Sequence, residues 1–381
     1  MKKYTYKKYI QTMMLAVAVI PFFSSCDYLD KEPDDMLTID AVFDNADYTK
    51  QWLAGVYNLV PDPLWEYMNF AGYGYYMMSD ETQMASSLGQ FGWGNLMNVQ
   101  QGSWTPTQII PGKNLWKETY QKVRSGLIFL ERVKEIPDQR QTVELVERYK
   151  NEVRFLIAYY YSRMLEVYGP FPLITSLMDV NDSGEVLKKE RTPYDEIVNY
   201  LDNEFMELSK ILPSSYDNVN IGRPTSGACL ALRARMLMFA ASPLFNDNVP
   251  YCTEPPQDAV TNHQVWYGAY KPELWDQCLQ ACVDFFTELQ SRGYYELTQA
   301  TEATAKGYRD AYNKAYFTRE NNKELLISFE SKYPGATTSE NVERIITDFK
   351  KKQKRNQTLN WLKNQKQENA QDIEADDELD Q

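Results

Sequence analysis

One long stretch constrains the fold of this chain more than any other: residues 142 to 168 have a helical pattern that ends abruptly. The second half of the stretch is rich in apolar and aromatic residues, including the run Tyr159-Tyr160-Tyr161. Gly169 and Pro170 follow directly, and glycine favours the end of a helix while proline cannot continue one. At about 1.5 Å per residue, the helix is roughly 40 Å long and must pack against several other elements. The sequence therefore predicts a helical scaffold.

The N-terminus has the three parts of a lipoprotein signal peptide. Four lysines precede a short apolar segment, residues 13 to 20, and small residues stand directly before Cys26. The apolar segment is far shorter than the ~18 residues that a membrane-spanning helix needs. We expect cleavage after residue 25 and acylation of Cys26, because several acyl chains together anchor a protein stably where one does not. An ordinary signal peptide, in which Cys26 has no role, is the alternative.

The charge of the chain argues against one class of partner. The full sequence has 40 basic and 53 acidic side chains, and residues 1 to 25 contain four lysines and no acid. The mature protein therefore has 36 basic against 53 acidic side chains, a formal net charge of −17. Because an acidic surface of this size repels phosphate backbones, the sequence predicts no nucleic-acid partner.

Metal and cofactor chemistry find little support in the sequence. Cys278 and Cys282 lie one helical turn apart, but the chain has a single histidine, His263, and no second cysteine pair at ligand spacing. We expect these cysteines to be buried as small apolar residues, while a disulfide that involves Cys252 stays open. No glycine pattern for phosphate or dinucleotide binding occurs, so no cofactor is expected.

The rest of the chain has the pattern of helical hairpins separated by loops. Thr192-Pro193 offers a capping hydroxyl and a first-turn proline for one helix, and Pro213 stops it. We predict three helix pairs: 116 to 136 with 142 to 168, 193 to 212 with 224 to 241, and 272 to 290 with 307 to 317. Small side chains let paired helices approach closely. These units predict an all-α fold of tetratricopeptide-like helical hairpins with long aromatic-rich loop insertions.

Several blocks of the sequence resemble those of the SusD/RagB family of nutrient-binding lipoproteins. The stretch from Arg154 to Leu173 resembles the signature helix of that family. Other blocks follow in the family's order: 26–30, 80–81, 191–197, 222–225, 231–235, 241–244, 295–297 and 324–329. No single block is highly specific, but their order after a lipoprotein signal is hard to obtain by chance.

The resemblance implies a location and a partner. Family members are lipid-anchored at the outer membrane and face the cell surface, where they bind a nutrient beside a SusC-like, TonB-dependent transporter without enzymatic activity. The resemblance and the composition together divide the chain into a signal peptide (1–25), a SusD-like helical domain (26–338) and an atypical charged tail (339–381). Because members usually continue beyond block 324–329, we expect a C-terminally truncated or altered member. The tail should be disordered or a single solvated helix.

Two loop regions have the composition of a glycan site. Sugar rings present apolar C–H faces and a fringe of hydroxyls, so a site combines aromatic platforms with amide, carboxylate or guanidinium groups. Residues 63 to 104 and the insertion around His263 meet this demand, and family members draw ligand contacts from these regions. The candidate ligand-binding residues are Trp65, Tyr67, Tyr73, Tyr75, Asp80, Glu81, Trp93, Asn95, Trp104, Trp266, Tyr267 and Tyr270. For any single tryptophan, packing in the core or in the loop is favoured, because large aromatic side chains are mostly buried, whereas for each cluster as a whole we favour binding.

Three functions of different classes fit these features. The first is binding of an oligosaccharide, or of a peptide as in RagB, for delivery to the transporter. The second is a tetratricopeptide-like adaptor of the transporter complex without its own ligand. The third is a glycosidase, which needs two carboxylates about 5 to 9.5 Å apart. We assign the adjacent Asp80 and Glu81 to ligand or loop contacts, and a Ser-His-Asp triad could use only His263, so the sequence favours binding without catalysis.

Overall fold

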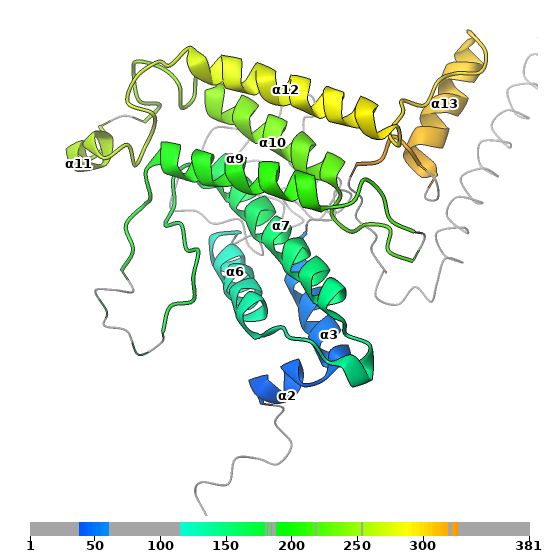
Figure 1. Ribbon diagram of the computed structural model, residues 1–381. Coiled ribbons are helices and arrows are strands. Elements are labelled where there is room, and N and C mark those ends of the chain that lie inside the picture. Colours follow the sequence, from blue (N-terminus) through cyan, green and yellow to red (C-terminus); the bar gives the residue numbers. More distant parts are fainter. Residues whose placement is uncertain are drawn as a thin grey trace, which may run out of the picture. The chain divides into compact units, whose positions relative to one another are not determined.

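The structure, a computed structural model, describes residues 38–60, 115–179, 181, 184, 188–217, 219–252, 254–318 and 322–326. All of them belong to the first of the two compact units into which the chain divides, Met1–Ser328. Within these ranges the protein is built from helices and has no strand (Figure 1). This confirms the all-α prediction. Among the described helices, none combines the length and apolarity that a bilayer crossing requires.

The helices pack in an order that mostly follows the chain. Helix α6 packs on α7, α7 on α9, α9 on α10, and α10 on α12, while α3 lies against both α6 and α7 (Figure 1). The elements are α2 (Ile39–Phe43), α3 (Ala46–Tyr57), α6 (Leu115–Arg132), the 3-10 turn η4 (Pro137–Gln139), α7 (Val143–Tyr168), α9 (Tyr194–Ile211), α10 (Ser226–Ala241), α11 (Gln257–Thr261), α12 (Glu273–Arg292) and α13 (Ala305–Phe317).

Helix α7 is the long helix that the sequence predicts, with the predicted ends. The Thr142 side chain accepts a hydrogen bond from Leu145 N and so caps the first turn. Gly169 ends the helix with φ +64°. A Cβ at this position would lie 3.3 Å from the Phe245 ring, so both the backbone conformation and the space favour glycine.

The tyrosines of α7 use their hydroxyls to hold neighbouring segments. Tyr160 and Tyr161 are fully buried. Tyr160 OH donates to Val56 O of α3, and Tyr161 OH donates to Ile174 O, 2.7 Å away, beyond the Gly-Pro break. A buried hydroxyl needs such a partner, because an unpaired polar group in the core is costly. The aromatic face therefore both fills the core and orders the chain around it.

The second helix pair is confirmed, with one correction at its start. The predicted apolar face of α9 is buried: Tyr194, Ile197, Val198, Leu201, Phe205, Leu208 and the C-cap Leu212. Thr192, however, does not cap α9. The helix begins one residue later than predicted, so its N-cap is Pro193, which has no side chain that can accept a hydrogen bond. Thr192 Oγ1 instead accepts from Leu173 N at 3.0 Å and ties the segment after α7 to the start of α9.

The prediction of a third pair made of α12 and α13 is wrong for the described residues. Helix α12 packs on α10 instead and buries Leu274, Cys278 and Ala281 there. Arg233 of α10 joins the layers, because its guanidinium donates to Asp202 of α9 at 2.6 Å and to Asp284 of α12 at 2.8 Å. Helix α10 thus has partners on two sides, and α12 packs on α10 where the sequence predicts α13.

Candidate functional site

Most candidate ligand residues lie outside the described part of the chain. The structure describes Trp266, Tyr267 and Tyr270, which belong to the segment between α10 and α12. The candidates outside the described residues are Trp65, Tyr67, Tyr73, Tyr75, Asp80, Glu81, Trp93, Asn95 and Trp104, together with the lipidation candidate Cys26. The geometry of a candidate site can therefore be built from the α10–α12 segment, residues 242–272.

A buried asparagine holds the two ends of the α10–α12 segment together. Asn246 Nδ2 donates to Lys271 O at 2.9 Å, and Lys271 N donates back to Asn246 Oδ1 at 2.6 Å. Asn246 is 2% exposed, so these hydrogen bonds are shielded from water. Tyr267 N also donates to Phe245 O, at 3.2 Å. The segment is therefore a loop with a fixed base and not a free linker.

Two of the three described candidates are core residues and not surface platforms. Trp266 and Tyr267 are each 3% exposed. The Tyr267 ring meets the Tyr194 ring edge-on with centroids 4.8 Å apart, and Tyr194 stacks on Phe245 at 4.5 Å. Burial raises the pKa of the Tyr267 hydroxyl above its ordinary value. A ligand cannot stack on rings that the protein already covers, so the expectation of surface platforms is corrected for these two residues.

The loop does expose other aromatic rings. Tyr270 is 49% exposed, and its backbone N–H donates to Asn248 Oδ1 at 3.2 Å, which places an exposed amide beside it. Tyr251, which the sequence interpretation did not single out, is 48% exposed and packs edge-on against Phe245. An exposed ring fixed by backbone contacts and accompanied by amide groups can bind a sugar face. Tyr270 with Asn248, and Tyr251 of the same loop, are the candidate site residues.

The only histidine of the chain has a structural place in this loop. His263 has φ +54°, and its carbonyl oxygen accepts from Tyr194 N at 2.9 Å. Its ring packs on Gly268, where a Cβ would lie 2.9 Å from Nε2 and where φ is +85°. The contacts of His263 with Gly268 and Tyr194 thus give it a packing role in this loop.

A buried carboxylate lies in the N-terminal half of α7. Glu152 is 0% exposed and accepts from Tyr57 OH at 2.8 Å and from Arg223 Nη1 at 2.6 Å, with Arg148 Nε 3.4 Å away. Burial raises the pKa of Glu152 above its ordinary value, although Arg223 and Tyr57 favour the charged form. The group joins α3, α7 and the turn before α10, so it positions the turn that carries Thr225.

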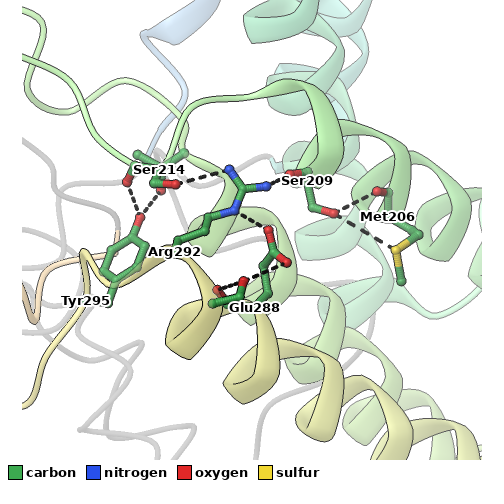
Figure 2. A network of polar contacts seen from close by, with 8 residues as sticks. Met206, Ser209, Ser214, Glu288, Arg292 and Tyr295 are labelled. Atoms are coloured by element: carbon green, nitrogen blue, oxygen red, sulfur yellow. Dashed lines mark hydrogen bonds and ion pairs between the residues drawn. The ribbon is translucent and has the colours of Figure 1, made fainter.

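Arg292, at the C-terminal end of α12, is the centre of a polar junction (Figure 2). Its guanidinium donates to Ser214 Oγ at 3.1 Å, to Ser209 O at 3.2 Å and to the Glu288 carboxylate. Figure 2 shows the guanidinium directed from α12 toward the end of α9. Through Arg292, the last turn of α12 is attached to the last turn of α9 and to the residue that follows Pro213.

Three blocks that are distant in the sequence meet beside this junction. Tyr295 OH donates to Ser214 O at 2.7 Å and lies 2.9 Å from Thr225 Oγ1, which donates to Leu326 O at 3.2 Å. The Tyr295 ring packs directly on Gly227, where a Cβ would lie 2.8 Å from ring atoms. Segments 222–225, 295–297 and 324–326 are thus a connected unit, and Gly227 is required because the ring occupies the space of a side chain.

Comparison with known proteins identifies the family. A SusD-like family model, described as "Starch-binding associating with outer membrane", matches residues 27–238, which is more than half of the 381-residue chain. The chain belongs to the SusD-like family. This family binds starch and related glycans, and it is a binding family and not an enzyme family. No curated protein sequence matches the chain.

Solved structures share the fold of this SusD-like chain. BT4246 is similar with a TM-score of 0.57 and 24% identity over 76% of this chain and 51% of its own. A SusD-like protein from Bacteroides fragilis has a TM-score of 0.54 and 18% identity, over 80% and 48% of the two chains. A SusD homolog from Bacteroides thetaiotaomicron has a TM-score of 0.51 and 18% identity, over 78% and 49%. The chain thus spans about half the length of these structures, and the likeness supports the helical, tetratricopeptide-like fold.

Proposed function

We propose that this SusD-like chain is a cell-surface lipoprotein that binds an oligosaccharide and delivers it to a SusC-like, TonB-dependent transporter of the outer membrane. The observation that carries the proposal is the family match, which starts one residue after Cys26 and has the description of a starch-binding, outer-membrane-associated protein. Its proposed organisation is a signal peptide (1–25), a helical domain (26–338) and a charged tail (339–381). Acylation of Cys26 anchors the mature protein.

The ligand contacts are proposed in two loops. In the α10–α12 segment, Tyr270 and Tyr251 are the rings that a sugar can reach, and Asn248 supplies an amide beside them. The aromatic residues of loop 63–104 remain candidates for the same site. The proposed role of the protein is to capture the ligand without a chemical step, because the family is a binding family.

Binding without turnover is the test of this function. The full mature chain is mixed with soluble starch, laminarin, xyloglucan and inulin, and affinity electrophoresis and titration calorimetry measure binding while chromatography detects cleavage products. We expect binding to at least one polysaccharide with no products. Failure to bind any polysaccharide, with binding of peptides instead, would replace the glycan by a peptide ligand; product formation would overturn the binding-only function.

The site is tested by a matched pair of tyrosines. Tyr270→Ala should weaken binding about two- to thirteenfold, because a stacking ring contributes roughly 0.5–1.5 kcal/mol. Tyr48→Ala, on α3, is the control, since Tyr48 is also exposed but lies far along the chain from the loop. Equal affinity of both variants and the parent would remove Tyr270 from the site. Pull-down of the transporter with each variant measures the proposed delivery complex separately.

A further inference from the structure

Helix α13 (Figure 1) has exposed large aromatic residues, while its small residues are buried or half-buried. Gly307 is buried, and Ala311 and Ala315 are half-buried along the same side of the helix. The next row holds three tyrosines at intervals of four residues, with exposures between 61% and 65%: Tyr308, Tyr312 and Tyr316. A helix that buried its hydrophobic side chains for stability would have the opposite arrangement. The tyrosine row is therefore available for binding.

The tyrosine row has the geometry of an extended platform. The rings of Tyr312 and Tyr316 are nearly parallel, with an interplanar angle of 10° and centroids 5.8 Å apart. Tyr308 lies one turn earlier, so the row covers about 12 Å along the helix axis. Phe317 adds a fourth ring, edge-on to Tyr316 at 5.1 Å. This length accommodates several consecutive sugar residues and not a single one.

Polar groups run beside the tyrosine row. Arg309 and Asn313 follow Tyr308 and Tyr312 by one position each, and on a helix this places them in the adjoining row; both are exposed. A guanidinium and an amide are suitable partners for sugar hydroxyls at the edge of rings that stack on the platform. The helix itself is held at both ends: Thr304 Oγ1 accepts from Gly307 N at 3.1 Å, and Asn322 Nδ2 donates to Ala315 O at 2.6 Å.

We infer that the tyrosine row of α13, with Arg309 and Asn313, is a second oligosaccharide-binding surface, which takes a chain of several pyranose units. The inference rests on the proposed glycan-binding function and adds a site to it. The chemistry of the row fits a sugar, because the phenol rings suit its apolar C–H faces and the exposed guanidinium and amide beside them suit its hydroxyls.

The test uses the full mature chain and the polysaccharide that the parent protein binds among soluble starch, laminarin, xyloglucan and inulin. The double variant Tyr312→Ala, Tyr316→Ala should weaken polysaccharide binding about tenfold or more, because it removes two stacking rings. Tyr312→Phe keeps the ring and should retain most of the affinity. Alanine is the better helix former, so the double variant should fold, and circular dichroism verifies its helix content. Phe286→Ala, on the apolar face of α12, is the exposed control and should bind as the parent does.

The length of the oligosaccharide provides a second readout. With oligosaccharides of increasing length from the same polysaccharide, the ratio of the parent's affinity to that of the double variant should grow with length, because only longer oligosaccharides reach the row. An unchanged affinity of the double variant, while Tyr270→Ala binds less tightly, would overturn the second surface and leave the proposed function standing. Loss of transporter pull-down with unchanged polysaccharide binding would identify the row as a protein contact. A parent protein that binds none of the polysaccharides would overturn both proposals.

Discussion

Removing one hydroxyl group from each of two buried tyrosines should have opposite effects on stability. Tyr161 OH donates to Ile174 O at 2.7 Å and accepts from Ile174 N at 3.3 Å. Tyr267 is also buried, but within the described chain its hydroxyl has no hydrogen-bond partner. The change from Tyr to Phe is the same chemical deletion at both sites, and both rings stay in place.

The magnitudes follow from the hydrogen bonds that are lost. Tyr161→Phe deletes two hydrogen bonds, each with a net contribution of about 0.5–1.5 kcal/mol, and leaves both backbone groups of Ile174 without that partner. We expect its free energy of unfolding to fall by about 2 kcal/mol. Tyr267→Phe removes a buried polar atom that forms no compensating bond, so its free energy of unfolding should stay the same or rise by up to about 1 kcal/mol.

Urea denaturation followed by circular dichroism measures the difference, with the slope against urea verified to be equal among the variants. Calorimetric titration with polysaccharide completes the comparison, because a core residue should leave the affinity unchanged. A Tyr267→Phe variant as unstable as Tyr161→Phe would refute the reasoning, since the Tyr267 hydroxyl would then have a partner. Weakened glycan binding by Tyr267→Phe would instead return this residue to the ligand site.

Three further predictions concern the anchor, the buried charge and helix packing. Cys26→Ala should release the mature chain from the membrane fraction on cell fractionation, and continued membrane association would contradict acylation. Because the pKa of Glu152 is raised in the folded protein, folding favours its protonated form. The free energy of unfolding of the parent relative to Glu152→Gln should therefore be greatest below the ordinary carboxyl pKa and should decline as the pH rises through the raised pKa. Glu147→Gln is the exposed control. Gly126→Ala should lower the free energy of unfolding by about 1–3 kcal/mol, because the new Cβ would lie 3.1 Å from α7 side chains. Gly55→Ala places its Cβ where nothing lies within 4 Å, so it should raise the free energy of unfolding by about 0.5–1 kcal/mol. Denaturation measurements on both variants check these values.

The sequence predicts the helices well because their signals are local. Thr142 and Gly169 mark the ends of α7 through capping and backbone preference, which act within a few residues. The apolar row of α9 likewise predicts its buried face. Thr192 shows the limit of such signals, because the helix begins one residue later than its pattern suggests and the hydroxyl serves the distant Leu173 instead.

The candidate site is less predictable because loop residues have no periodicity that separates inside from outside. The sequence does not distinguish Trp266, Tyr267 and Tyr270, yet the first two are buried and Tyr270 is exposed. Tyr267 is packed against Tyr194, a residue more than seventy positions earlier in the chain. The pairing of α12 with α10 is decided in the same way, by an arginine that contacts acids on both neighbouring helices. Long-range contacts of this kind leave no local pattern to read.

The hydrogen bonds between Asn246 and Lys271 have a consequence for how the ligand preference can change. They close the loop at its base, so we expect that residues 247–262, between this base and His263, can be exchanged or lengthened without moving α10 or α12. Doubling the length of such a loop costs only about 0.6 kcal/mol of closure entropy. Loops of different composition grafted between Asn246 and His263 would therefore allow one helical scaffold to recognise many polysaccharides.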